Sequence, residues 1–461
     1  MRSDALKTKI HNFFDLSHLT ITENGKRISV FSLAFPTFLQ YVLLAVIGTV
    51  NTAMISGYAE DAVGAIAAAS QLITLASAMV AMIKVGTNVM VNISLGRGDK
   101  ESAARYAGAS MILSLIWGTL ISITFAFFAS DILEIMNIEG DALLYGKSYL
   151  QIYGGALVIQ IVADSITSLL VCYGYTMYTM VKSICTTAIG VLSGYIFLNV
   201  DIIPYIDGTV ALAIGNVVSF IFNIFISSLL IFRVAIPIRA TINVRIVSNM
   251  LRVGIPGGMS TISYMIAQTI TTSFMASIGM IALNTKSYVG TIVQYTYFVS
   301  AALSTGVQIM MGRYVGQKDE VKMRKLVRTA LKIAVLSNGI CSLLVCIAHK
   351  SLLTMFTDDP DVFAIASIIF VIDIAVEVIR AINHVMEPSL NATRDVYTTF
   401  TASVISCWGG SVFLSYLFGI RLGMGITGCW LAFAIDELVK ASIYAIRWHS
   451  GKWKKKLGID N

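Results

Sequence analysis

Residues 35–39 read Phe-Pro-Thr-Phe-Leu and residues 255–259 read Ile-Pro-Gly-Gly-Met, so two prolines in apolar surroundings lie 220 residues apart. Three further pairs of like residues share this offset: Gly86 and Gly306, Gly96 and Gly316, and Asp99 and Asp319. A fixed long offset of this kind indicates an internal duplication. The sequence therefore predicts two equivalent halves.

The composition indicates that both halves are embedded in a membrane. Of 461 residues, 56% are hydrophobic and 13% are charged, and the mean hydropathy is +0.77. A soluble domain carries about 25% charged residues, so a soluble enzyme is excluded. At about 20 apolar residues per crossing, the chain has room for about a dozen helices. The net charge of +7 does not indicate nucleic-acid binding, because the basic residues lie between the apolar runs.

We predict an all-α integral membrane protein with twelve transmembrane helices in two six-helix repeats. Because six is even, the repeats are parallel and related by an axis along the membrane normal. The predicted spans are 29–56, 62–95, 104–129, 146–172, 177–199, 209–233, 250–279, 286–312, 326–348, 362–388, 398–419 and 424–447.

The domain organisation follows from these spans. Residues 29–233 form the first half and 250–447 the second, joined by a cytoplasmic linker at 234–249. Residues 1–28 are a polar cytoplasmic segment, because they lack the short apolar core and cleavage site of a signal peptide. Residues 448–461 are a basic cytoplasmic tail.

The distribution of Lys and Arg predicts the orientation. Basic residues concentrate in the two termini and in the loops on the same side as the termini, and basic loops stay cytoplasmic. The opposite loops carry only Lys147, Lys286, Lys350 and Arg421. We therefore expect a multi-pass protein with both termini in the cytoplasm.

Several motifs stand in a characteristic order. They are Gly-Thr-Val-Asn-Thr-Ala-Met-Ile-Ser-Gly at 48–57, Gly-Arg-Gly-Asp-Lys-Glu at 96–101, Gly-Gln-Lys-Asp-Glu at 316–320, Glu-Val-Ile-Arg-Ala-Ile-Asn at 377–383 and Leu-Asn-Ala-Thr-Arg-Asp at 390–395. With them, almost the whole chain resembles the multidrug and toxic compound extrusion (MATE) transporters of bacteria. The resemblance implies a cell-membrane antiporter that exports small organic compounds by alternating access, coupled to H⁺ or Na⁺. It implies no cofactor other than that ion, and we expect a monomer.

Two positions depart from the family. The first span often carries an Asp where this chain has Asn51, and some members carry a Glu in span seven where this chain has Tyr264. The carboxylate that couples transport to an ion must then lie elsewhere.

Span ten offers such carboxylates. A charge at the bilayer centre costs about 2.5–3.5 kcal/mol on insertion scales. Each charge in a span therefore needs a partner, a water-filled cavity or a place near the membrane interface. Asp373, Glu377, Arg380 and Asn383 recur at helical spacing and share one face. We predict a proton or Na⁺ site there. The alternative is a structural ion pair between span ten and a neighbour.

Other charges in the spans favour structural roles. Asp436 and Lys440 are four residues apart near the end of span twelve, and we predict an ion pair that stabilises the fold. Lys84 and Asp164 either pair with each other or lie separately near an interface.

Polar and aromatic residues in three spans suggest a substrate site. We assign Asn51, Tyr264, Gln268, Gln294 and Tyr295 to substrate binding, because aromatic faces beside amide groups suit flat organic cations. Tyrosines of a membrane protein also form interfacial belts, which is the alternative.

Pro36 and Pro256 are candidate hinges, because a proline inside a helix frees a carbonyl and bends the axis. The alternative is a proline in a first turn, where it costs little.

The leading function is export of amphipathic, cationic organic compounds in exchange for H⁺ or Na⁺. A flippase for lipid-linked saccharide precursors is the alternative. We expect no enzyme activity and no metal site, because the histidines and cysteines show no paired spacing and no lysine-containing Gly-rich phosphate loop is present.

Overall fold

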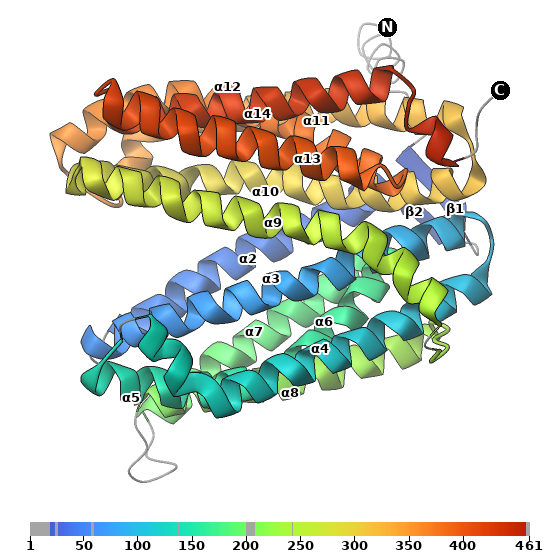
Figure 1. The fold of residues 1–461 in the computed structure, drawn as a ribbon, viewed down its shortest axis with the longest axis horizontal. Helices are drawn as coiled ribbons and strands as arrows, with labels where there is room; N and C mark the ends of the chain where they lie inside the picture. Colours follow the sequence, from blue (N-terminus) through green and yellow to red (C-terminus); the bar gives the residue numbers. More distant parts are fainter. Residues whose placement is uncertain are drawn as a thin grey trace, which may run out of the picture. The chain divides into compact units, whose positions relative to one another are not determined.

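The computed structural model describes residues 19–23, 26–56, 60–136, 138–199, 208–241 and 243–457, and it is almost entirely helical (Figure 1). A short antiparallel hairpin, β1 (Thr20–Glu23) and β2 (Lys26–Ser29), precedes the first helix. The helices are α2 Val30–Ser56, α3 Glu60–Gly96, α4 Lys100–Ile135, α5 Gly140–Tyr149, η2 Leu150–Gly154, α6 Leu157–Cys172, α7 Thr176–Asn199, α8 Gly208–Val234, α9 Val244–Ile278, α10 Met280–Gln317, α11 Glu320–Leu353, α12 Pro360–Ala392, α13 Val396–Ser406, η3 Cys407–Arg421, α14 Gly425–His449 and η4 Lys454–Leu457.

Within the described residues, each of the twelve predicted spans corresponds to a helix or a helix pair. The predicted span 146–172 is bent by 44° where η2 meets α6. The predicted span 398–419 starts as α13 and continues as the wider π-helix η3. Seven described helices, or eight with the bent pair, are long and apolar enough to cross a membrane by length and composition alone.

The internal duplication is visible at the helix ends. Asp99 caps α4 by accepting a hydrogen bond from Ser102 N at 2.8 Å, and Asp319 caps α11 by accepting one from Lys322 N at 3.0 Å. These side chains satisfy amide groups that have no partner within the helix. The residues before the two caps, Gly98 and Lys318, both have left-handed backbones (φ 76° and 57°). Equivalent positions of the two halves thus adopt the same local structure.

The chain divides into two compact units. Unit one comprises the described residues up to Phe38, residues 92–98, and everything from Met259 onward; unit two comprises residues 39–91 and 99–258. In unit one, α12 packs against α10, α11 and α14. In unit two, α8 packs against α7 and α6, and α6 against α4.

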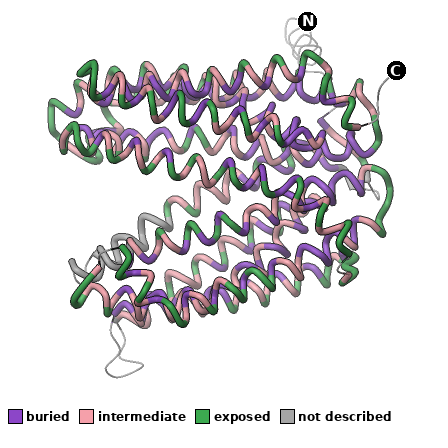
Figure 2. Tube along the Cα trace, in the orientation of Figure 1, coloured by how far each residue is buried: buried purple, intermediate pink, exposed green. Residues whose placement is uncertain are grey.

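Buried residues run the length of α12, from Val362 to Ala392, and buried stretches also occur on the other helices (Figure 2). A core of unit one joins Phe370 of α12 with Val289 of α10 and Trp430 of α14. Charged side chains on the buried side of α12 are therefore held inside a helical bundle.

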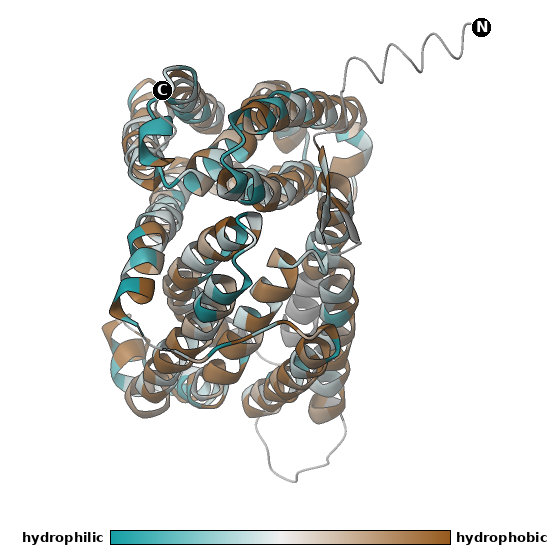
Figure 3. Cartoon of the chain, turned by 90° about the vertical axis from the view of Figure 1, so that its right-hand side faces the viewer, coloured by the Kyte–Doolittle hydropathy of each residue, from teal (hydrophilic) through white to brown (hydrophobic). Residues whose placement is uncertain are grey.

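The outward surfaces of the helices are apolar. Phe127, Phe232, Ile347 and Ile446 are each at least 70% exposed, and hydrophobic residues cover most of the helical ribbon (Figure 3). Such surfaces suit lipid rather than water.

Both candidate hinge prolines lie inside helices. Pro36 is in α2, and Pro256 is in α9 more than three turns beyond its start at Val244. The first-turn alternative is therefore wrong for Pro256. The division between units passes through α2 just after Phe38 and through α9 just after Gly258, so each proline lies within three residues of it.

Candidate functional site: a charged network in the second half

The polar stripe of α12 is buried in unit one. Its residues recur every three or four positions, so they lie on one side of the helix. Asp373 is 4% exposed and Glu377 is not exposed at all. The helices that cover the stripe supply its partners.

Arg380 bridges carboxylates from two helices. Its Nη1 forms an ion pair with Glu377 of α12, and its Nε lies 3.3 Å from Oε1 of Glu437 in α14. Asp373 has a different partner, because its Oδ1 accepts a hydrogen bond from Nε1 of Trp430 at 3.0 Å. In the structure the second carboxylate bonded to Arg380 is thus Glu437, a residue that the sequence analysis did not select.

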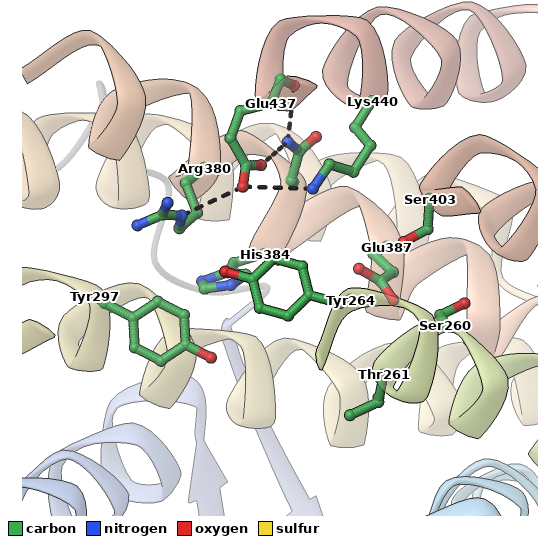
Figure 4. Close-up of a pocket in the computed structure, with 11 residues that line it drawn as sticks. Ser260, Thr261, Tyr264, Tyr297, Arg380, His384, Glu387, Ser403, Glu437 and Lys440 are labelled. Atoms are coloured by element: carbon green, nitrogen blue, oxygen red, sulfur yellow. Dashed lines mark hydrogen bonds and ion pairs between the residues drawn. The ribbon is translucent and has the colours of Figure 1, made fainter. Parts of the chain in front are cut away.

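Glu437 joins the predicted ion site to the predicted ion pair (Figure 4). Asn383 Nδ2 donates to Glu437 Oε2 at 2.7 Å and to its backbone oxygen at 2.9 Å. Lys440 Nζ lies 3.4 Å from Glu437 Oε1 and 3.5 Å from Asp436 Oδ1. Asp436 and Lys440 do meet, but as part of a network that reaches Arg380.

Three oxygens of this network lack a hydrogen-bond partner. Among the described residues, nothing donates a hydrogen bond to the buried Oε2 of Glu377, the buried Oδ1 of Asn383 or the buried Oδ1 of Asp436. Leaving a buried polar atom unpaired costs free energy, and a proton or a bound cation would remove that cost. In the described ranges no three or more His, Cys, Asp or Glu side chains form a metal-binding group.

A cavity of about 260 Å³ adjoins the network. Two tyrosine rings line it, and each has an internal cation over it: Arg380 Cζ lies 5.9 Å from the Tyr297 ring centroid, and Lys440 Nζ lies 5.9 Å from that of Tyr264. The lining residues are Ser260, Thr261, Tyr264, Tyr297, Arg380, Asn383, His384, Glu387, Ser403, Glu437 and Lys440.

Of the four residues assigned to substrate binding from sequence whose side chains the structure describes, Tyr264 lines this cavity and the other three do not. Gln268 and Gln294 are half-buried elsewhere on their helices, and Tyr295 packs edge-on against Phe298. The side chain of Asn51 lies outside the described residues.

Unit two holds a separate polar network. Lys84 Nζ and Asp164 Oδ2 lie 2.9 Å apart, which confirms the pairing that the sequence left open. Gln160 and Asn223 extend this network through hydrogen bonds of 3.2 and 2.8 Å. Lys182, 4% exposed, donates to the hydroxyl groups of Thr167 and Ser227.

The sequence contained some signal for the residues that were overlooked. Glu437 precedes Lys440 by three residues, and Glu387 follows Arg380 by seven, so each lies on the face of a residue already selected. The pattern could not show that these faces meet across α12 and α14.

Comparison with known proteins identifies the fold family. The MatE family profile matches the chain twice, at residues 36–196 and 256–417. The two matches repeat the 220-residue offset between Pro36 and Pro256.

Individual relatives cover nearly the whole chain. The uncharacterized transporter YisQ of Bacillus subtilis is 30% identical over 436 residues, which is 94% of this chain and 96% of YisQ. A probable multidrug resistance protein NorM of Thermotoga maritima is 21% identical, covering 93% and 94% of the two chains. A crystal structure of MATE in the bent conformation is 18% identical, with a TM-score of 0.85 over 93% of this chain and 96% of that one.

Two profile matches cover well over half of the chain, and the relatives and the solved fold agree with them. The chain therefore belongs to the MatE family of multidrug and toxic compound extrusion transporters, which are membrane transporters and not enzymes.

Proposed function

We propose that this transporter exports amphipathic, cationic organic compounds in exchange for H⁺ or Na⁺. The multidrug transporters among its relatives support the substrate class. The charged network of unit one supports the coupling, with Asp373, Glu377, Arg380 and Asn383 as its residues on α12.

One observation carries the coupling proposal. Glu377 is fully buried, pairs with Arg380 through Oε1, and has no donor for Oε2 among the described residues. Protonation of Glu377 would remove its charge and weaken its hold on Arg380. Arg380 would then pair with Glu437 of α14 alone, which would draw its side chain toward α14 and change the packing of α12 against α14.

The proposed binding site for the substrate is the cavity beside the network. Tyr264 and Tyr297 present aromatic faces that already attract cations of the protein itself. An organic cation would compete for those faces by the same cation–π attraction. Gln268, Gln294 and Tyr295 remain proposed substrate contacts outside the lining of this cavity, and Asn51 also remains a proposed substrate contact.

The remaining parts of the proposal concern the whole protein. We place it as a monomer in the bacterial cytoplasmic membrane, in keeping with its bacterial relatives. The basic loops support an orientation with both termini in the cytoplasm. Pro36 and Pro256 are the proposed hinges, and a MATE protein has been solved in both a bent and a straight conformation. A flippase for lipid-linked saccharides has less support, because the named relatives with a function are multidrug proteins.

Dye efflux from reconstituted vesicles tests the proposal. Protein in vesicles loaded with ethidium should expel the dye faster when either an H⁺ or a Na⁺ gradient is imposed, and the effective gradient identifies the ion. Glu377→Gln should abolish the acceleration, whereas Glu134→Gln, an exposed acid at the end of α4, should not. Efflux that ignores both gradients would refute coupling.

A further inference from the structure

We infer that the start of α11 and the carboxyl-terminal tail together form a surface that binds the headgroups of acidic phospholipids. This basic surface consists of Lys325 and Arg328 of α11 and Lys452 and Lys455 of the tail. None of the four belongs to the charged network of α12 and α14, so the inference goes beyond the proposed function.

Both segments are strongly basic. Residues 313–332 contain seven Lys or Arg and two acidic residues, and residues 447–457 contain five Lys or Arg and no acidic residue. The two acids, Asp319 and Glu320, each pair with a basic side chain already. Most of the positive charge therefore has no acid within these segments to balance it.

The fold brings the tail against the start of α11. Lys454 Nζ lies 2.7 Å from Oε1 of Glu320, and Cζ of Arg324 lies 6.0 Å from the ring centroid of Trp453. Trp453 is fully buried, and its Nε1 donates to the backbone oxygen of Trp448 at 3.0 Å. The tail is thus held in place, and its exposed lysines lie beside the basic turns of α11.

The four side chains of the basic surface are available to a ligand. All four residues are exposed, and within the described part of the chain no ion pair or hydrogen bond involves their side chains. Clusters of basic residues next to a transmembrane helix attract acidic lipids. The partner that this surface fits is therefore negatively charged.

The face of α11 that carries these charges favours a lipid over a soluble anion. Steps of three or four residues, which mark one helix face, join Lys325, Arg328, Lys332, Leu336, Ile340, Leu343 and Ile347. The four apolar residues of this stripe are each at least 49% exposed, which suits contact with lipid tails. One face of the helix is therefore basic near its start and apolar further along, as a phospholipid is charged at its head and apolar along its tails.

The length of α11 brings its basic turns to the level of the headgroups. Its 34 residues extend over about 51 Å, whereas the hydrocarbon core of a bilayer is about 30 Å thick. The first turns therefore extend beyond the hydrocarbon, where long basic side chains reach lipid phosphates.

The first half shows that the repeated fold does not require this stripe. The 220-residue offset pairs Arg328 with Gly108 and Lys332 with Ile112. Gly108 is buried, and a side chain there would collide with the backbone of Arg239 in the linker. The linker thus covers in α4 the position that is exposed and basic in α11.

A lipid titration of the purified, full-length protein in neutral detergent tests the inference. Dioleoyl-phosphatidylglycerol is the acidic probe and dioleoyl-phosphatidylcholine the neutral one, and the melting temperature reports binding. Lys325→Gln/Arg328→Gln should raise the half-saturating mole fraction of phosphatidylglycerol about tenfold, equivalent to about 1.4 kcal/mol. The response to phosphatidylcholine should not change. Lys452→Gln/Lys455→Gln should weaken phosphatidylglycerol binding as well, because both segments form the surface.

The controls separate the basic surface from general charge and from folding. Lys350→Gln/Arg421→Gln removes two exposed charges from the far ends of α11 and η3 and should leave the titration unchanged. Lys325→Arg/Arg328→Lys keeps the charge and should behave as the wild type does. Without lipid, all variants should melt near the wild-type temperature, because the substituted side chains are exposed.

Three results would overturn the inference. The first is an unchanged phosphatidylglycerol titration in Lys325→Gln/Arg328→Gln, and the second is an equal loss in Lys350→Gln/Arg421→Gln. The third is equal stabilisation by soluble glycerol phosphate or polyphosphate, because the surface would then bind anions in general and not a lipid.

Discussion

Arg380 of α12 pairs with two carboxylates that are not equivalent, Glu377 of its own helix and Glu437 of α14. Glu437 has further partners in Lys440 and Asn383, whereas the side chain of Glu377 has Arg380 as its one ion-pair partner among the described residues. Loss of Arg380 would leave Glu377 as a buried, uncompensated charge.

This difference predicts the behaviour of Arg380→Ala. The variant should lose about 3–5 kcal/mol of stability, the range for breaking a buried pair, and show a lower melting temperature in detergent. Adding Glu377→Gln should restore most of that loss, and adding Glu437→Gln should restore less. If the network is a switch, the stable Arg380→Ala/Glu377→Gln protein will not transport. A stable double variant that still pumps against a gradient would reduce the network to a structural role.

At this scale, sequence spacing predicted which residues share a face but not which faces meet. Asp373, Glu377 and Arg380 lie on one stripe of α12 as expected, and the Asp436–Lys440 pair forms. The bond from Trp430 to Asp373 and the bond from Arg380 to Glu437 join residues 57 positions apart. They depend on packing between helices, which spacing along one helix does not encode.

Among the helices, the end of α14 and the tail after it form a second ionic cluster. Asp395, in the turn between α12 and α13, is buried and pairs with Arg447 at 2.5 Å and Lys456 at 2.9 Å. Trp448 and Trp453 stack with centroids 4.6 Å apart. The tail is thereby fastened to the turn between α12 and α13.

We expect Asp395→Asn to cost about 1–3 kcal/mol, as for loss of a hydrogen-bonded charge. Burial by itself raises the pKa of Asp395, but hydrogen bonds from Arg447, Lys456 and Thr398 outweigh it and hold the pKa below its usual value. The stabilisation is therefore present above about pH 4, the pKa in the unfolded chain, and is lost as the pH falls through the folded-state pKa.

Thermal melting at a series of pH values measures how the stabilisation by Asp395 depends on pH. The gap in melting temperature between wild type and Asp395→Asn should narrow as the pH falls below about 4. Asp358→Asn, an exposed acid before α12, serves as the control and should match the wild type throughout. A gap that does not change with pH would contradict the ionic explanation.

The proposed bending takes place in α2 and α9, the helices that contain Pro36 and Pro256. Because a proline inside a helix costs about 3 kcal/mol, Pro36→Ala and Pro256→Ala should keep or raise the melting temperature. If bending is required for transport, both should lower efflux severalfold. Pro360→Ala is the control, because a proline at the start of α12 does not bend the helix. It should change neither the melting temperature nor the efflux rate. Full efflux in both hinge variants would exclude hinges at these positions.

For the whole molecule, the twelve helices and the duplication were predictable because apolar length and repeated motifs are properties of the chain itself. The bend at η2 and the π-helix η3 were not, since they depend on local backbone geometry. The cavity was not predictable either, because its lining comes from α9, α10, α12, α13 and α14.

Orientation in the membrane is a prediction at this scale. A tag after Lys456 and a tag near Arg245 should both be protected from impermeant reagents in intact cells, because basic segments stay in the cytoplasm. A tag near Asp141, in the first turn of α5, should be accessible. External labelling of either of the first two would overturn the twelve-span topology.

The central claim is that Glu377 couples transport to an ion without being needed for substrate movement itself. Substrate counterflow in vesicles, compared with uphill accumulation under an ion gradient, tests it most directly with one radiolabelled cation, 1-methyl-4-phenylpyridinium. The account predicts that Glu377→Gln retains counterflow and loses uphill accumulation. Uphill accumulation at the wild-type level in Glu377→Gln would contradict it.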